Sequence, residues 1–176
     1  MPGMSNEYGG ALFELAKDEG IAKEILDALR AVDKLFSENP GYIAFLCTPG
    51  IPLSERRDAI RQAFDGNVHE YVCSFIEMLT ERGHMRGFSD CVNEYVRKYN
   101  SHFGISVAEV ISAVPLTRKE RDKLTRKLEA MSGRRVNLIP SIDPGLIGGL
   151  IIRMDGKLID GSLRTRLNEL HEVLSK

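Results

Sequence analysis

Apolar residues in the first part of the chain recur at helical spacing. They form two stripes, each a set of apolar residues along one side of a helix, and the first stripe ends at Gly20. The second runs from residue 21 to 36 and stops before Pro40, because proline cannot continue a helix. The first stripe, at i, i+3, i+4, i+7 and i+8, consists of Tyr8, Ala11, Leu12, Leu15 and Ala16. These patterns predict two helices, each with one face turned toward a core.

Four further helices are predicted before residue 104. A short apolar helix falls in residues 41–47, a second runs from residue 54 toward residue 64, and two more stripes cover residues 68–79 and 85–99. Helices with brief connections and one apolar face each can bury those faces only against one another. We therefore predict an N-terminal six-helix bundle over residues 1–104.

Two adjacent glycines, Gly9 and Gly10, fall inside the first predicted helix. Glycine is a poor helix former because its backbone loses more conformational freedom than that of other residues, and each glycine costs roughly 1 kcal/mol relative to alanine. We therefore expect this helix to form less firmly at its start.

The pattern changes to strand character after residue 104. Residues 105–114, ISVAEVISAV, are rich in β-branched side chains and end at Pro115, so they predict a strand. Thr117 and Glu120 have the spacing of a capping box, which starts a helix that ends at Gly133. Residues 134–140 then predict a second strand. The apolar face of this helix is Leu124, Leu128 and Met131.

Residues 143–162, DPGLIGGLIIRMDGKLIDGS, predict a β-hairpin. The Asp155-Gly156 pair tolerates the positive φ angles of a two-residue turn, and counting outward from it pairs Met154 with Lys157 and Ile152 with Ile159. The face expected to pack inward carries Leu150, Ile152, Met154 and Ile159. The two glycines at 148 and 149 are expected to allow a bulge or the close approach of a neighbouring backbone.

A final helix is predicted after this hairpin. Ser162 is a good N-cap, and the leucines beyond it recur at spacings of 4, 3 and 4. They are Leu163, Leu167, Leu170 and Leu174. Residues 105–176 thus predict a small C-terminal α/β domain with a hairpin and a final helix. The whole chain is expected to be α+β and mainly α.

Composition and charge agree with two soluble units. Of the 176 residues 43% are hydrophobic, and apolar runs are far shorter than the roughly 20 residues of a membrane-spanning helix. The N-terminus lacks the pattern of a targeting signal, which favours a bacterial cytoplasmic protein. Residues 1–104 hold 11 basic and 16 acidic residues, a net of −5, whereas residues 105–176 hold 13 and 9, a net of +4. This asymmetry suggests different partners for the two units.

Motifs for catalysis, cofactors and metals are missing from the sequence. The glycines at 148 and 149 lead into a strand rather than a helix, so they do not form a phosphate-binding loop, and GxGxxG and GxxxxGK[ST] are absent. Asp143, Asp155 and Asp160 each have a local structural role in a turn or at a helix entrance. The histidines and cysteines are scattered without metal-ligand or triad spacing. We therefore predict no catalytic residue, no cofactor and no metal.

A basic segment leaves a second function class open. Residues 118–135, RKERDKLTRKLEAMSGRR, carry eight basic and three acidic residues, a net of +5 that could contact nucleic-acid phosphates. Interspersed acids and the lack of aromatic residues favour a solvated helix face. The alternative is therefore a soluble helical adaptor or nucleic-acid-binding protein that uses this segment.

Three stretches together resemble one family. They are YGGALFELAKDEG near the start, ERGHMRGFSDCVNEYVRKYNSHFGISVAEVISAVPLT across the predicted domain boundary, and IDPGLIGGLIIRMDGKLIDGSLRTRLNELHEVL at the end. With them, the whole chain resembles the delta subunit of bacterial F-type ATP synthases, which is related to the mitochondrial oligomycin-sensitivity-conferring protein. The last stretch is the most specific because it is long and ordered.

The resemblance implies a stator component rather than an enzyme. In this family the N-terminal domain binds the N-terminal helices of alpha subunits on the catalytic head, and the C-terminal domain meets the C-terminal region of the peripheral-stalk b subunits. The chain is then expected as one monomeric copy per complex at the cytoplasmic face of the bacterial cell membrane. It would be peripheral to that membrane, without insertion, and would couple ion flow to ATP synthesis. Neither nucleic acid nor a cofactor is implied.

The first and fifth predicted helices are the candidate groove for the alpha subunit, on the strength of the resemblance. Helix-lined grooves accept the apolar face of a partner's amphipathic helix. The candidate residues are Tyr8, Ala11, Leu12, Leu15, Val72, Phe75, Ile76 and Leu79. Some of them must face the domain's own core, and the sequence leaves open which. The leucines of the final helix are likewise either core residues or contacts to the b subunit, with the core favoured.

Overall fold

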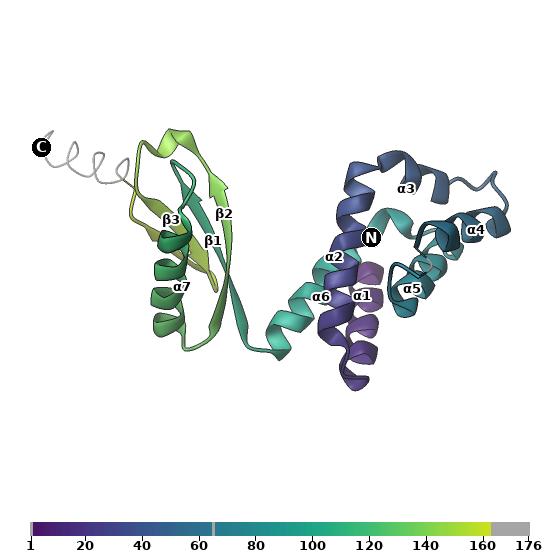
Figure 1. Ribbon diagram of the computed structural model, residues 1–176, viewed down its shortest axis with the longest axis horizontal. Helices are drawn as coiled ribbons and strands as arrows, with labels where there is room; N and C mark the ends of the chain where they lie inside the picture. Colours follow the sequence, from purple (N-terminus) through teal and green to yellow (C-terminus); the bar gives the residue numbers. More distant parts are fainter. Residues whose placement is uncertain (1, 65, 163–176) are drawn as a thin grey trace, which may run out of the picture. The chain divides into compact units, whose positions relative to one another are not determined.

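The computed structural model describes residues 2–64 and 66–162 (Figure 1). The chain separates into two compact units, one extending to Tyr99 and the other beginning at Asn100. Each unit has its own secondary structure and its own core. Among the described residues there are seven α-helices, six in the first unit and one in the second, and one four-stranded sheet. The mainly helical α+β class is therefore confirmed at this level.

The first unit contains only helices and turns among its described residues (Figure 1). A 3-10 turn, Met85–Gly87, precedes the last helix, which ends three residues beyond the division between the units. The helices are α1 (Pro2–Asp18), α2 (Ala22–Glu38), α3 (Pro40–Leu46), α4 (Leu53–Phe64), α5 (Glu70–Glu81) and α6 (Phe88–His102). Each of the six predicted helical segments thus corresponds to one observed helix.

Aromatic rings join these helices in the core. Phe36 of α2 contacts Phe88 edge-on, with a centroid distance of 4.9 Å, and Phe64 of α4 at 5.8 Å. Tyr95 of α6 is fully buried, packs edge-on against Phe13 of α1 and donates its hydroxyl proton to the carbonyl oxygen of Ala22 at 2.9 Å. Burial raises the pKa of Tyr95, so its hydroxyl remains a donor at physiological pH. These contacts connect α1, α2, α4 and α6.

The second unit is a four-stranded sheet with helix α7 on one face (Figure 1). Strands β1 and β2 are parallel and joined through α7, and β3 pairs antiparallel with both β1 and β4, so the order is β2-β1-β3-β4. The elements are β1 (Ile105–Ser112), α7 (Arg118–Ser132), β2 (Arg135–Ile142), a 3-10 turn (Pro144–Leu146), β3 (Leu150–Met154) and β4 (Lys157–Asp160). Pro140 is tolerated inside β2 because β2 is an edge strand.

The predicted capping box and hairpin are confirmed. The Thr117 Oγ1 accepts from the backbone N–H of Glu120, and the Glu120 carboxylate accepts from the backbone N–H of Thr117. The hairpin pairs Met154 with Lys157 and Ile152 with Ile159, as counted from its turn. Both turn residues, Asp155 and Gly156, have positive φ, at 50° and 75°.

One burial prediction in this hairpin is wrong. Ile159 lies on the same face as Ile152, but it is 41% exposed while Ile152 is 7% exposed. Helix α7 packs against β2, and the core that Leu128 of α7 joins holds residues of β1, β2 and β3 but none of β4. The core under α7 consists of Ala108, Val110, Leu128, Val136 and Ile152. The final helix predicted after Ser162 lies outside the described residues.

Candidate partner-binding groove

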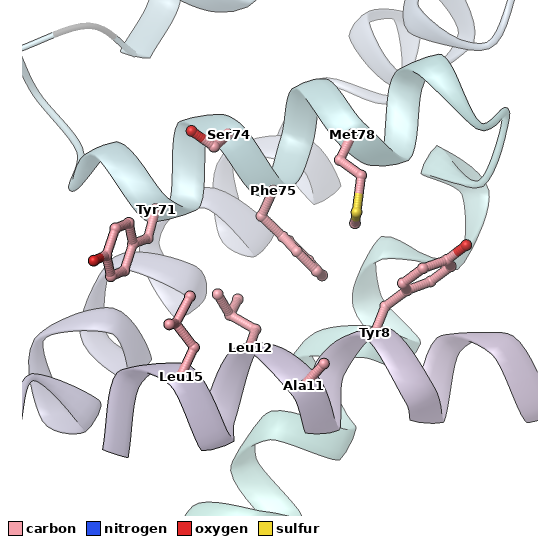
Figure 2. Close-up of a pocket in the computed structure, with 8 residues that line it drawn as sticks. All are labelled: Tyr8, Ala11, Leu12, Leu15, Tyr71, Ser74, Phe75 and Met78. Carbon is pink, nitrogen blue, oxygen red and sulfur yellow. The ribbon is translucent and has the colours of Figure 1, made fainter. Parts of the chain in front are cut away.

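A groove of about 380 Å³ opens between helices α1 and α5 (Figure 2). Its lining is almost wholly apolar and comes from these two helices alone. The lining residues are Tyr8, Ala11, Leu12, Leu15, Tyr71, Ser74, Phe75 and Met78. Figure 2 shows Leu12 and Phe75 facing each other at the middle of the groove, with Tyr8 and Met78 toward one end and Leu15 and Tyr71 toward the other.

Both walls of the groove have the same helical spacing. The α1 wall places residues at 8, 11, 12 and 15, and the α5 wall at 71, 74, 75 and 78, so each is an i, i+3, i+4, i+7 set. Such a set forms one continuous stripe along a helix. The two stripes therefore line a trough with the repeat of an α-helix, the shape into which a third amphipathic helix could pack.

Exposure varies from the base of the groove to its edge. Leu12 and Phe75 are only 7% and 6% exposed, so they form the base and are held by the core beneath. Leu15 is 46% exposed and lies at the edge. At the Tyr8 end, the Tyr8 ring lies beside the His84 ring with a centroid distance of 5.9 Å. The groove thus has a rigid base and an accessible apolar edge.

The structure divides the eight predicted groove residues into two groups. Tyr8, Ala11, Leu12, Leu15 and Phe75 line the groove. The other three, Val72, Ile76 and Leu79, are completely buried and do not line it. They lie on the core side of α5, so they belong to the packing of the first unit and are not surface for a partner.

Three groove residues were not predicted from the sequence: Tyr71, Ser74 and Met78. Each lies one position before a predicted residue, Val72, Phe75 or Leu79, on a second face of α5 that shares Phe75 with the first. A signal for this second face was present, because Tyr71, Phe75 and Met78 are themselves at helical spacing. Ser74 gives no such signal, because most serines in folded proteins are exposed to solvent.

The groove offers binding surface but no chemistry. Its lining contains no acid, base or thiol, and its polar groups are the hydroxyls of Tyr8, Tyr71 and Ser74. Across residues 2–64 and 66–162, no group of three or more His, Cys, Asp or Glu side chains could hold a metal ion. The arrangement is suited to burying apolar surface.

The three aspartates to which the sequence assigns structural roles form hydrogen bonds within the fold. Asp143 accepts from the backbone N–H of Gly145 at 2.9 Å, and Asp155 accepts from the hydroxyl of Ser106 at 3.0 Å. Asp160 accepts from the backbone N–H of Ser162 at 2.9 Å. The Asp143 bond closes the turn at Pro144, as its sequence position predicts, and the Asp155 bond joins the hairpin turn to Ser106 of β1. The Asp160 bond lies at the end of β4, and the helix entrance predicted for Asp160 lies outside the described residues.

The glycines of the same stretch allow close backbone contact. A Cβ on Gly149, which has a φ of 86°, would lie 2.4 Å from the carbonyl oxygen of Gly161. Only glycine accommodates both this distance and this φ angle. The prediction of a close approach of neighbouring backbone is therefore confirmed at Gly149.

The basic segment 118–135 lies on helix α7 and the first residue of β2. Two of its three acids have roles in the fold: hydrogen bonds from Thr117 lower the pKa of Glu120, and Glu129 accepts from the backbone N–H of Val136 at 3.2 Å. The basic side chains are exposed. The basic side chains therefore form the solvent-exposed side of α7, and Leu128 forms its buried side.

Comparison with known proteins decides the family. A family model described as "ATP synthase delta (OSCP) subunit" matches residues 4–174. This chain belongs to the ATP synthase delta (OSCP) family. The resemblance noted in the sequence is confirmed, and it extends over nearly the whole chain.

Delta subunits from several organisms are similar to this member of the family. That of Alkaliphilus oremlandii (strain OhILAs) is 31% identical and that of Enterococcus hirae is 32% identical, each alignment covering 98% of this chain and 96% of the relative. The chloroplastic delta subunit of Galdieria sulphuraria is 32% identical, over 91% of both chains. Because the relatives are delta subunits, this delta-family chain is a non-catalytic subunit of ATP synthase, as predicted.

A solved structure shows the same fold. A chain in the cryo-EM structure of the Toxoplasma gondii mitochondrial ATP synthase hexamer matches this delta-family chain with a TM-score of 0.70 at 18% identity, covering 98% of this chain and 97% of that one. Within the described ranges, no helix of the delta-family chain is both long enough and apolar enough to cross a membrane.

Proposed function

We propose that this chain is the stator link of a bacterial F-type ATP synthase. The first unit binds the N-terminal helices of alpha subunits on the catalytic head, and the second unit binds the C-terminal region of the b subunits. One monomeric copy serves each complex, at the cytoplasmic face of the cell membrane. The chain transmits mechanical load, so that ion flow remains coupled to ATP synthesis, and carries out no covalent step.

The groove between α1 and α5 is the observation that carries the proposal. An amphipathic helix presents apolar residues at i, i+3, i+4 and i+7, and both walls of the groove have that spacing. Interfaces of ordinary size bury about 800 Å² per partner, with an apolar core and a polar rim. The exposed part of Leu15 and the half-buried rings of Tyr8 and Tyr71 supply the apolar surface that such docking would remove from water.

A firm base under the groove suits a load-transmitting contact. Leu12 and Phe75 are held by the core, and the neighbouring residue Phe13 packs edge-on against the fully buried Tyr95. A partner helix seated on such residues would not need to order them first, which reduces the entropic cost of binding. Tight association without catalytic groups is what a stator requires.

Calorimetry of the full chain with a synthetic peptide of the alpha-subunit N-terminus tests the proposal. We expect a dissociation constant in the micromolar range or tighter, which corresponds to about −8 kcal/mol or more. Leu15→Asp should weaken binding at least tenfold, because it places a charge on the apolar edge. Leu35→Asp is the matched control, since Leu35 is also a helical leucine that is 46% exposed but lies outside this groove.

Two results would contradict the proposed groove. One is an absence of heat with the unchanged chain at tens of micromolar peptide. The other is equal weakening by Leu15→Asp and Leu35→Asp, since that would indicate a general effect of the added charge. Far-ultraviolet circular dichroism of both variants verifies that the helices remain folded.

A further inference from the structure

Positive charge in the second unit is concentrated on one element. Residues 118–135 hold eight basic and three acidic residues, a net of +5, whereas the other described residues from 105 to 162 hold two and four, a net of −2. Charge that served only solubility would be spread over the surface with both signs mixed. The separation gives α7 and the turn after it a positive field, which attracts anionic groups.

The basic residues of this segment are not used within the fold. All eight are exposed, and none of them forms an ion pair with a described residue. Of the acids in the segment, Glu120 and Glu129 accept hydrogen bonds from backbone N–H groups, which leaves Asp122 to balance the eight bases. In the first unit, by contrast, Arg57 and Arg61 pair with glutamates of α5.

The positions of the basic residues do not serve the stability of α7 either. The dipole of a helix favours acidic residues in its first turn and basic residues in its last turn. Helix α7 carries Arg118, Lys119 and Arg121 within its first four residues, and its last turn holds no basic residue. Residues that depart from such a local rule without a gain to the fold are expected at functional sites.

Three basic residues form a straight row on the side of α7 that faces away from the sheet. Lys119, Lys123 and Arg126 are at i, i+4 and i+7, so the row extends about 10 Å along the helix. At about 100° per residue, each of them lies within about 40° of the direction opposite Leu128, the buried residue of α7. We call Lys119, Lys123 and Arg126 the basic stripe.

An acidic helix is the partner that matches the basic stripe. Neighbouring helices pack with their axes about 8–10 Å apart, and at that distance long basic side chains reach carboxylates on the next helix, as they do along the charged flanks of coiled coils. Carboxylates at i, i+3 or i+4, and i+7 form a row with the same repeat as the basic stripe. A helix with such a row can therefore pair with all three bases at once.

Nucleic acid fits the basic stripe less well. Proteins that bind nucleic acid commonly contact about 6–10 phosphates, whereas the basic stripe is a single row of three side chains. Single strands are also bound by stacking of bases on aromatic rings, and residues 118–135 contain no aromatic residue. The chemistry of the stripe thus favours an acidic protein segment.

We propose that the basic stripe of α7 binds an acidic helical segment in the C-terminal region of the b subunit. The inference rests on the proposed function, which assigns that region of b to the second unit, and it adds the place and the chemistry of the contact. The stripe steers the b segment toward α7 and sets its position along the helix. Exposed charges of this kind act mainly on the association rate and on its dependence on salt.

Binding kinetics of the full chain with the soluble C-terminal part of the b subunit test the inference. Lys119→Glu combined with Arg126→Glu, the stripe variant, should slow association about tenfold and change the dissociation rate much less. Raising the salt from about 0.05 M to about 0.3 M should remove most of this difference, because salt screens exposed charges. Lys157→Glu combined with Arg153→Glu is the matched control, since it makes the same charge change at exposed positions of the β3–β4 hairpin. The control should associate at nearly the rate of the unchanged chain.

A charge reversal in the b fragment tests the chemistry of the partner. Replacing the acidic residues of its C-terminal helix with lysine should slow association with the unchanged chain and speed association with the stripe variant, about tenfold in each case. Unchanged association rates would overturn the assignment of an acidic partner.

The remaining outcomes separate the inference from the proposed function. Equal slowing by the stripe variant and the control, or slowing by neither, would overturn the inference and leave the contact to b in place. No binding of the b fragment to the unchanged chain would remove that contact and the inference together. Tight binding of a short DNA duplex that the stripe variant abolishes would assign the stripe to nucleic acid instead. Far-ultraviolet circular dichroism verifies that both variants are folded.

Discussion

At the scale of single residues, Gly9 sets how closely helices α1 and α6 approach. A Cβ at Gly9 would lie 2.3 Å from the carbonyl oxygen of Cys91 and 3.1 Å from the Cβ of Glu94, whereas one at Gly10 would meet only the Lys98 side chain, at 3.7 Å. Steric contact with backbone cannot be relieved by a rotamer change. Gly9 is therefore a contact residue between two helices.

We expect Gly9→Ala to lower the free energy of unfolding by about 1–3 kcal/mol, the usual cost of overpacking. Gly10→Ala should raise it by up to about 1 kcal/mol, because alanine is the better helix former and has room there. Denaturant unfolding of both variants measures the difference. Equal stability of the two variants would show that α1 and α6 do not approach as closely as described.

Glu94 gives the first unit a pH dependence. The carboxylate, 7% exposed, accepts from Arg97 through Nε at 2.7 Å and Nη2 at 2.6 Å, and these hydrogen bonds lower the pKa of Glu94. The folded pKa lies below the unfolded one, so the stabilisation is complete above the ordinary carboxyl pKa. It is lost as the pH falls through the folded pKa.

Glu94→Gln should accordingly reduce the slope of unfolding free energy against pH between about pH 5 and about pH 3. The measurement is the urea midpoint at several pH values, with Glu19→Gln, at an exposed helix-end position, as the control. If Glu94→Gln has the same slope as the unchanged chain, the ion pair does not contribute to acid sensitivity.

At the scale of elements, helix α7 depends on its capping box. Thr117 and Glu120 satisfy each other's backbone N–H groups at the start of the helix. Thr117→Ala should cost about 1 kcal/mol of local stability and speed amide exchange in the first turn of α7. Thr125→Ala is a matched control inside the helix and should be neutral or slightly stabilising. Identical exchange in both variants would contradict the role of the cap.

Elements were largely predictable because their signals are local. Periodicity, Pro40, the capping box and the Asp155-Gly156 turn each act within a few residues, and within residues 2–64 and 66–162 the elements that they predict match the structure. Which face of α5 lines the groove was not predictable, since α5 carries two overlapping apolar faces and only packing decides between them. The prediction that Ile159 is buried was wrong for the same reason. The hairpin sequence carries no information on how much of the sheet α7 covers.

The role of Gly9 was hidden for a related physical reason. From the sequence it reads as a helix-weakening residue, because the backbone it approaches, at Cys91, lies on another helix far along the chain. Contacts between distant segments depend on how helices cross. Single-residue propensity carries no information about them.

At the scale of the whole molecule, the two units have different surfaces. The first presents an apolar groove whose lining contains no acidic or basic residue, and the second presents a helix whose exposed side is basic. Membership in the delta (OSCP) family places the chain among the non-catalytic subunits of ATP synthase. In the proposed function, the chain acts by binding other subunits tightly, and the groove between α1 and α5 is the site that binds the alpha subunit.

Reconstitution of coupled ATP synthesis tests the central claim most directly. ATP synthase stripped of this subunit is supplied with the unchanged chain, with Leu15→Asp combined with Met78→Asp, or with the control Leu35→Asp. The unchanged chain and the control should restore ion-driven ATP synthesis, whereas the double variant should restore little, although ATP hydrolysis by the head continues in every case. Full restoration by the folded double variant would contradict the groove as the contact to the catalytic head.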